Sequence, residues 1–145
     1  MAHQRLTTSE VEAAARRLPG GAAPARLLEE KDRNQVFAVG GQAIFKTYLT
    51  DGSARQARKI AALEFLADRG LPVPRLLGHG VVPKDNGGVP WTLETRVVAD
   101  HVRPGRDELN TPQGWELHRA LGRWLPALHA FGGLACFGTW DAGGR

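Results

Sequence analysis

The spacing of apolar residues predicts three β-strands in the first third of the chain. Strand-length runs occur at residues 25–32, 35–39 and 42–49, and Gly40 and Gly41 separate the last two runs. Two adjacent glycines can adopt the positive φ values of a tight hairpin. We therefore expect three antiparallel strands in sequence order, the last two forming a hairpin.

A helical period replaces the strand pattern after the "TDGS" turn. Ile60, Leu63 and Leu66 recur at helical spacing within residues 53–69, and Gly70 provides a stop signal. These positions predict an amphipathic helix.

A short N-terminal helix is predicted by its capping signals. Thr7 is followed three residues later by Glu10, as in a capping box, and Pro19, Gly20 and Gly21 interrupt the pattern. We expect this helix to flank the sheet.

Two further strands and one long helix are expected in the rest of the chain. The segments "RLLGHGVV" and "GVPWTLETRVV" surround the turn "KDNGG". Thr111 can cap a helix of residues 111–131, in which Pro126 predicts a kink or a break. The apolar face of that helix comprises Leu117, Leu121, Trp124, Leu125 and Leu128. Together the elements predict an α+β fold, with a five-stranded antiparallel sheet and the helix of residues 53–69 packed on one face.

Composition and charge exclude few classes of function. The formal net charge of +4 favours anionic partners such as nucleotides. Basic residues form no block of five or six, so nucleic-acid binding is not expected. The single cysteine, Cys136, excludes an internal disulfide, and the histidines lack metal-ligand spacing, so no metal site is predicted. Without a signal peptide or an apolar run of about 18 residues, we expect a cytoplasmic protein with no membrane contact.

Lys46 interrupts the apolar run of the third strand, directly after Ile44 and Phe45. Lysine is disfavoured in strand interiors, but it is common on edge strands, where it discourages aggregation. Its position alone therefore leaves both a structural and a functional role open.

Five segments, in this order, resemble the N-terminal half of the aminoglycoside phosphotransferase family, which has a protein-kinase-like fold. They are "NQVFAV", "AIFK", "AALEFLADRGLPVPRLLG", "WTLETRV" and "LGRWLPALHAF". The resemblance extends roughly from Ala25 to Phe137. It implies an N-terminal helical flank at residues 1–24, a kinase-like ATP-binding lobe at 25–99, and a linker with the start of an incomplete C-terminal lobe at 100–145.

The resemblance implies a site for ATP on this lobe. Lys46 matches the third-strand lysine that contacts the α and β phosphates of ATP. Val36, Ile44 and Leu93 resemble the apolar lining of the adenine slot, although as isolated residues they are more simply explained as core.

A hinge for the adenine edge is implied within "TLETRVV". Backbone groups around Thr95 and Val97 resemble those that hydrogen-bond adenine in the family. An ordinary central strand would look identical in sequence.

The chain departs from the family pattern at two points. Where the family has a glutamate on the helix after the third strand, this sequence has Lys59. Glu64 is a poor substitute, because it is rotated by about 140° from Lys59 around the helix. In addition, none of the seven aspartates is followed five residues later by asparagine, a pair that phosphoryl transfer in this fold requires.

Two hypotheses of function follow from these departures. The first is the ATP-binding lobe of a small-molecule phosphotransferase, truncated before the catalytic loop and inactive alone, with no catalytic residue of its own. In that case Mg²⁺ binds only when the missing C-terminal half is supplied. The alternative is a non-catalytic, kinase-like binding or interaction module.

The C-terminal segment is rich in apolar residues for a chain with one small sheet. We expect self-association, or contact with the missing half, through residues 115–140, because monomers seldom expose apolar patches beyond a few hundred Å². The residues concerned are Trp124, Leu125, Leu128, Phe131, Leu134, Phe137 and Trp140.

Overall fold

The computed structural model describes residues 4–18, 23–85, 87–97 and 111–130. These residues form an α+β fold whose elements follow one another in the order α1 (Thr8–Ala15), β1 (Ala25–Lys31), β2 (Asn34–Val39), β3 (Ala43–Thr47), α2 (Gly52–Asp68), β4 (Leu76–Val82), β5 (Val89–Thr95) and α3 (Pro112–His129). The described residues up to Val97 belong to one compact unit, and α3 belongs to a second. The predicted fold class, with its five strands, is confirmed.

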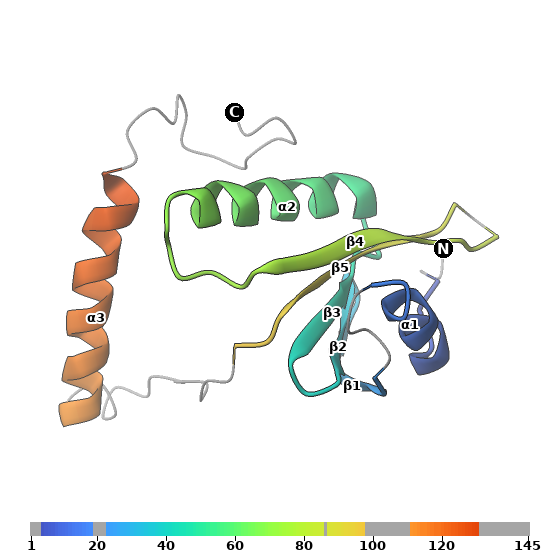
Figure 1. The fold of residues 1–145 in the computed structure, drawn as a ribbon, viewed down its shortest axis with the longest axis horizontal. Coiled ribbons are helices and arrows are strands. Elements are labelled where there is room, and N and C mark those ends of the chain that lie inside the picture. Colours follow the sequence, from blue (N-terminus) through green and yellow to red (C-terminus); the bar gives the residue numbers. More distant parts are fainter. Residues whose placement is uncertain (1–3, 19–22, 86, 98–110, 131–145) are drawn as a thin grey trace. The chain divides into compact units, whose positions relative to one another are not determined.

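The five strands form one antiparallel sheet in the order β1-β2-β3-β5-β4 (Figure 1). β2 and β3 make the predicted hairpin, in which Gly40 and Gly41 have φ values of 57° and 73°. A Cβ atom on Gly40 would lie 2.7 Å from the Cβ of Ala23, so glycine is required there for space as well as for its backbone conformation. α2 follows β3 directly and leads to the edge strand β4.

α1 and one face of the sheet enclose the hydrophobic core. Thr7 and Glu10 form the predicted capping box at the start of α1. The buried residues of this core are Leu6, Val11, Ala14, Ala15, Phe37, Val39, Ala43, Phe45, Val89, Trp91 and Leu93. The rings of Phe45 and Trp91 stack with centroids 4.8 Å apart. The N-terminal helix is therefore more than a flank, since it covers one face of the sheet.

α2 packs mainly against β4 and β5. The side-chain amide of Gln56 fastens the helix to both strands, because its Nε2 donates to the carbonyl oxygens of Gly80 and Trp91 at 2.8 and 2.7 Å. Gly70, with a φ of 71°, follows the end of the helix as predicted. Leu63 is the buried apolar residue of α2.

α3 continues through Pro126 to His129, so the proline does not break the helix. The missing N–H of Pro126 removes one intrahelical hydrogen bond close to the C-terminal end. The helix is closed beyond it by Ala130, whose N–H donates to the Pro126 carbonyl at 2.8 Å. The Leu128 side chain lies outside the described residues, as do the predicted contacts of Phe131, Leu134, Phe137 and Trp140. Among the helices that the structure describes, none has the length and apolar character needed to cross a bilayer.

Candidate functional site

Strand register places Lys46 on the face of the sheet opposite to the α1 core. Lys46 pairs with Val36 of β2 on one side and with Thr92 of β5 on the other, and Ile44 pairs with Glu94. Directly paired residues, and residues two apart on one strand, project from the same face. These five residues therefore share one face, which we call the lysine face.

The lysine face is only partly covered by a helix. α2 packs mainly over β4 and β5, and the side chains of Val36 and Ile44, on β2 and β3, are half-buried. Lys46 is also half-buried and lies between these two regions. An apolar surface that is open to a ligand thus adjoins a cation fixed on a strand.

A buried carboxylate on β5 joins α2 to the sheet. Glu94 is 6% exposed, and its Oε2 lies 3.2 Å from the Nζ of Lys59 on α2. The hydroxyl of Thr92 donates to the other carboxylate oxygen at 3.0 Å. Because that hydroxyl carries one hydrogen, the 3.0 Å contact between Thr92 and Tyr48 is a bond that the Tyr48 hydroxyl donates. Both oxygens of Glu94 are therefore engaged.

Tyr48 remains a hydrogen-bond donor over the whole physiological pH range. Its side chain is buried, and burial raises the pKa of Tyr48 to about 12. Two cations lie near the ring, with Lys46 Nζ 6.0 Å and Arg55 Cζ 5.9 Å from its centroid. At such distances cation–π attraction contributes at most about 1 kcal/mol for each cation.

The environment of Lys46 is unfavourable for the positive charge of its ammonium group. Burial lowers the pKa of Lys46 below its ordinary value of 10.5, and the neighbouring Lys59 lowers it further, while Glu94 acts in the opposite direction. Among the described residues, its ammonium group forms no ion pair and no hydrogen bond, since Glu94 is paired with Lys59 instead. An anionic ligand at Lys46 would relieve both penalties.

The likeness of this chain to known proteins is limited. No protein-family model matches the sequence. No functionally curated protein is significantly similar to it. Among solved structures, the ternary complex of APH(2″)-IIa with streptomycin and ATP resembles it with a TM-score of 0.47 and 14% sequence identity, over 68% of this chain and 31% of that one. The chain therefore spans less than a third of the length of the structure that it resembles.

The structure brings together three of the six site residues suggested by the sequence. Lys46, Val36 and Ile44 lie on the lysine face. Leu93 projects from the opposite face, where it is buried in the α1 core.

The predicted hinge residues lie at the end of β5. Thr95 belongs to the same side of the sheet as Leu93, and its N–H already donates to the carbonyl of Arg75 at 2.9 Å. Val97 follows the strand and is 64% exposed. The N–H of Thr95 is therefore engaged within the sheet.

Sequence reasoning missed Glu94 and its partners. The segment "VPWTLET" contains one acidic residue in an otherwise buried strand, and a carboxylate in such a position requires a cationic or hydrogen-bonding partner. A buried glutamate at this position predicts a positively charged side chain on a neighbouring element, and in the structure that side chain is Lys59. The sequence showed Lys59 in place of a helix glutamate, but the carboxylate on β5 that pairs with Lys59 was not expected.

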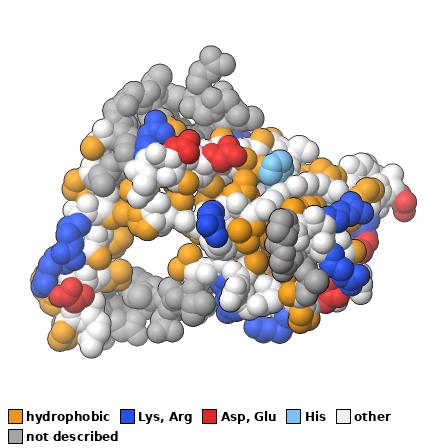
Figure 2. All heavy atoms as spheres, viewed as in Figure 1, with side chains coloured by type: hydrophobic (Ala, Val, Ile, Leu, Met, Phe, Trp, Pro, Cys, Tyr) orange, Lys and Arg blue, Asp and Glu red, His pale blue; other side chains and the backbone are white. Residues whose placement is uncertain are grey.

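On the face seen in Figure 2, Lys and Arg side chains lie in separate groups and form no continuous band. Within the described residues, no three His, Cys, Asp or Glu side chains are grouped so that they could hold a metal ion.

Proposed function

We propose that the lobe formed by residues 25–99 binds ATP on the lysine face, as the nucleotide-binding part of a small-molecule phosphotransferase of the aminoglycoside type. The observation that carries this proposal is the half-buried side chain of Lys46, which forms no ion pair with a described residue although Glu94 and Glu29 are near enough to raise its pKa. Lys46 would contact the phosphates, and the half-buried side chains of Val36 and Ile44 would provide an apolar floor for the base.

The order of elements supports this assignment. In protein kinases, a lysine on the third strand contacts the phosphates and forms an ion pair with a glutamate on the helix that follows. Here Lys46 occupies the third strand and α2 follows it, but the helix contributes Lys59 and the strand β5 contributes the carboxylate. Glu94 pairs with Lys59 and so joins α2 to the sheet, where a kinase would use a glutamate of the helix. Because Glu94 pairs with Lys59, Lys46 would be available to the ligand.

The charge balance of the site favours a phosphate group. Lys46 and Lys59 place two ammonium groups beside the one buried carboxylate of Glu94. Phosphate oxygens bound by fixed cations on rigid elements avoid the entropic cost of ordering a loop. ATP supplies the chemistry of a transferable phosphoryl group, and the described residues would bind and orient it.

Phosphoryl transfer requires groups that this sequence does not contain. Kinases place an aspartate and an asparagine five residues apart in the catalytic loop, and no aspartate here has that asparagine. We propose that residues 100–145 are a linker and the start of a second lobe, and that the 145 residues bind ATP without transferring its phosphate. Mg²⁺ would then be held with the help of residues from another segment or chain.

A non-catalytic binding module is the second candidate. It is favoured by Lys59, which stands where the family carries a glutamate, because this exchange alters the ion pair associated with catalysis. The two functions differ in what happens when a second lobe is added. A catalytic lobe would gain ATP turnover from an added downstream segment, and a binding module would not.

The proposal is tested by titrating ATP, with and without Mg²⁺, into the purified chain and into Lys46→Met. Methionine keeps the length and apolar stem of lysine, so the loss of a charged contact should weaken ATP binding by about tenfold or more. Because the folded state disfavours the Lys46 charge, this substitution should not lower the stability of the lobe.

Arg16→Met is the matched control. Arg16 follows α1, which covers the opposite face of the sheet, and its side chain is 63% exposed. The Arg16→Met variant should bind ATP as tightly as the parent. Equal affinities for the parent and Lys46→Met would refute the proposed site.

A further inference from the structure

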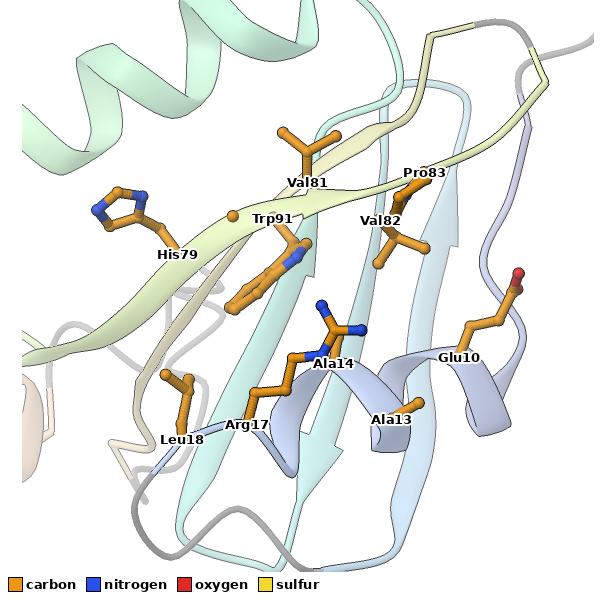
Figure 3. Close-up of a pocket in the computed structure, with 11 residues that line it drawn as sticks. Glu10, Ala13, Ala14, Arg17, Leu18, His79, Val81, Val82, Pro83 and Trp91 are labelled. Carbon is orange, nitrogen blue, oxygen red and sulfur yellow. The ribbon is translucent and has the colours of Figure 1, made fainter.

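A second site is indicated by a cavity on the α1 side of the sheet, away from Lys46. The cavity has a volume of about 300 Å³ and lies between α1 and β4, with Trp91 of β5 on its wall (Figure 3). This volume is at the lower end of the range of small-molecule sites. It could accommodate a ligand with one or two aromatic rings.

Two glycines on β4 leave room for side chains of the cavity wall. Gly78 and Gly80 pair with Leu93 and Trp91, so both face the α1 side. A Cβ atom on Gly78 would lie 2.4 Å from Leu18 Cδ1, and one on Gly80 would lie 3.0 Å from Trp91 Cζ2. Because neither glycine has a side chain, Leu18 and Trp91 lie against the strand backbone and form apolar walls.

Trp91 presents an unused hydrogen-bond donor at this cavity. The residue is 6% exposed and lines the cavity, and its indole N–H donates to no residue that the structure describes. Since no buried side-chain nitrogen or oxygen of the described residues lacks a hydrogen-bond partner, this N–H is accessible to solvent rather than enclosed. An acceptor group on a ligand would satisfy it.

The cavity also has one unpaired charge among its described lining residues. Glu10 accepts hydrogen bonds from Lys84 and from Thr7, and the Lys84 contact holds the pKa of Glu10 at about 2. Arg17, in contrast, forms no ion pair or hydrogen bond with a described residue. Figure 3 shows the Arg17 side chain directed into the space between α1 and β4. The lining therefore favours an anion.

We propose that this cavity binds a small aromatic carboxylate. The ring would lie between Leu18, Val82 and Trp91, and the carboxylate would accept hydrogen bonds from the Arg17 guanidinium and the Trp91 indole N–H. The site is on the opposite face of the sheet from Lys46, so it is independent of the proposed ATP site.

The test is a titration of the full chain with 2-naphthoate and with its neutral analogue 2-naphthalenemethanol. Binding is followed through the indole N–H signal of Trp91 in ¹⁵N NMR spectra, assigned with Trp91→Phe. We expect 2-naphthoate to shift this signal. Arg17→Leu should weaken 2-naphthoate binding by about tenfold or more, because a charged hydrogen bond is lost, and leave the alcohol unaffected.

Two further variants separate the cavity from general effects of substitution. Ala13→Leu places a larger side chain in the cavity from an exposed position of α1, where leucine keeps the helix intact, and should abolish binding of both compounds. Arg16→Leu removes an adjacent exposed arginine that does not line the cavity, and should bind like the parent.

Three results would overturn the proposal. These are no shift of the Trp91 signal at millimolar 2-naphthoate, a shift that persists in Ala13→Leu, or equal losses in Arg16→Leu and Arg17→Leu. Failure of ATP to bind would not affect it, since the two ligands are titrated separately against different residues.

Discussion

Lys46 and Lys59 lie near one buried carboxylate, which pairs with only one of them. Glu94 lies 3.2 Å from Lys59, while Lys46 has no anionic partner among the described residues and its pKa is lowered, chiefly by burial. A lysine in this position is a cation that the folded protein holds at a cost. Binding an anion offsets that cost, and this makes the affinity of the site sensitive to the protonation of Lys46.

The affinity for ATP should therefore fall at a lower alkaline pH than the ordinary lysine pKa of 10.5 would predict, in a range where the phosphates of ATP are already ionised. The sign follows from the pKa of Lys46, which is below 10.5, so its ammonium is lost before that of an exposed lysine. Tyr48, with a pKa of about 12, does not titrate in this window.

Lys46→Arg provides the control for this pH dependence, because a guanidinium stays charged throughout. Isothermal titrations at several pH values should show a decline for the parent and a flatter profile for the arginine variant. A decline of the same size in both would mean that Lys46 is not the titrating contact.

The sequence grouped Leu93 with Lys46 and Ile44, whereas the structure places it on the other face of the sheet, for a physical reason. In β5 the apolar residues Val89, Trp91 and Leu93 alternate with Pro90, Thr92 and Glu94, so the sequence distinguishes two faces but does not show which of them Lys46 shares. The pairing of Phe45 with Leu93 and of Lys46 with Thr92 assigns those faces, and this pairing depends on register. Glu94 was missed for the same reason.

At the scale of elements, α1 and α2 cover opposite faces of the sheet through different kinds of contact. α1 packs apolar side chains into the core, whereas α2 is joined to β4 and β5 through Gln56 and through the Lys59–Glu94 pair. Capping, turn and periodicity signals predicted both helices. They could not show which face each helix covers, because periodicity identifies an apolar stripe but not its partner.

Glu94→Gln should loosen α2 from the sheet. The substitution removes the carboxylate that accepts from Thr92 and pairs with Lys59, and it leaves Lys46 and Lys59 without a compensating charge. Because Lys59 is about one-third exposed and can partly regain water, we expect a loss of about 1–3 kcal/mol in the free energy of unfolding.

Urea unfolding measures this loss, with Glu64→Gln as the control on an exposed position of the same helix. The control should differ from the parent by no more than about 0.5 kcal/mol. If both variants unfold at the same urea concentration as the parent, the Lys59–Glu94 pair does not hold α2 in place.

At the scale of the whole molecule, α3 carries an apolar surface of its own. Leu121 and Leu125, which are one turn apart on the predicted apolar face, are 44% and 42% exposed. Self-association through residues 115–140 remains a prediction. Of this segment, the structure describes residues 115–130. An apolar helix face of this kind is often covered by a second copy or by another lobe.

Leu121→Asp should therefore shift the chain toward monomer in sedimentation experiments at tens of micromolar, roughly the range in which such surfaces associate. Arg123→Asp introduces the same side chain about 200° around the helix and should leave the association unchanged. A parent chain that sediments as a monomer, or identical behaviour of the two variants, would contradict the prediction.

The central claim is that ATP binds on the lysine face, and NMR of methyl groups tests its location most directly. Val36 and Ile44 provide methyl signals on that face, while Val11 and Leu93 provide them in the core on the α1 side. We predict that ATP shifts the signals of Val36 and Ile44 and leaves those of Val11 and Leu93 in place, and that Lys46→Met needs about tenfold more ATP or above to show the same shifts. Shifts confined to Val11 and Leu93, or shifts of Val36 and Ile44 at the same ATP concentration in the parent and Lys46→Met, would contradict the account.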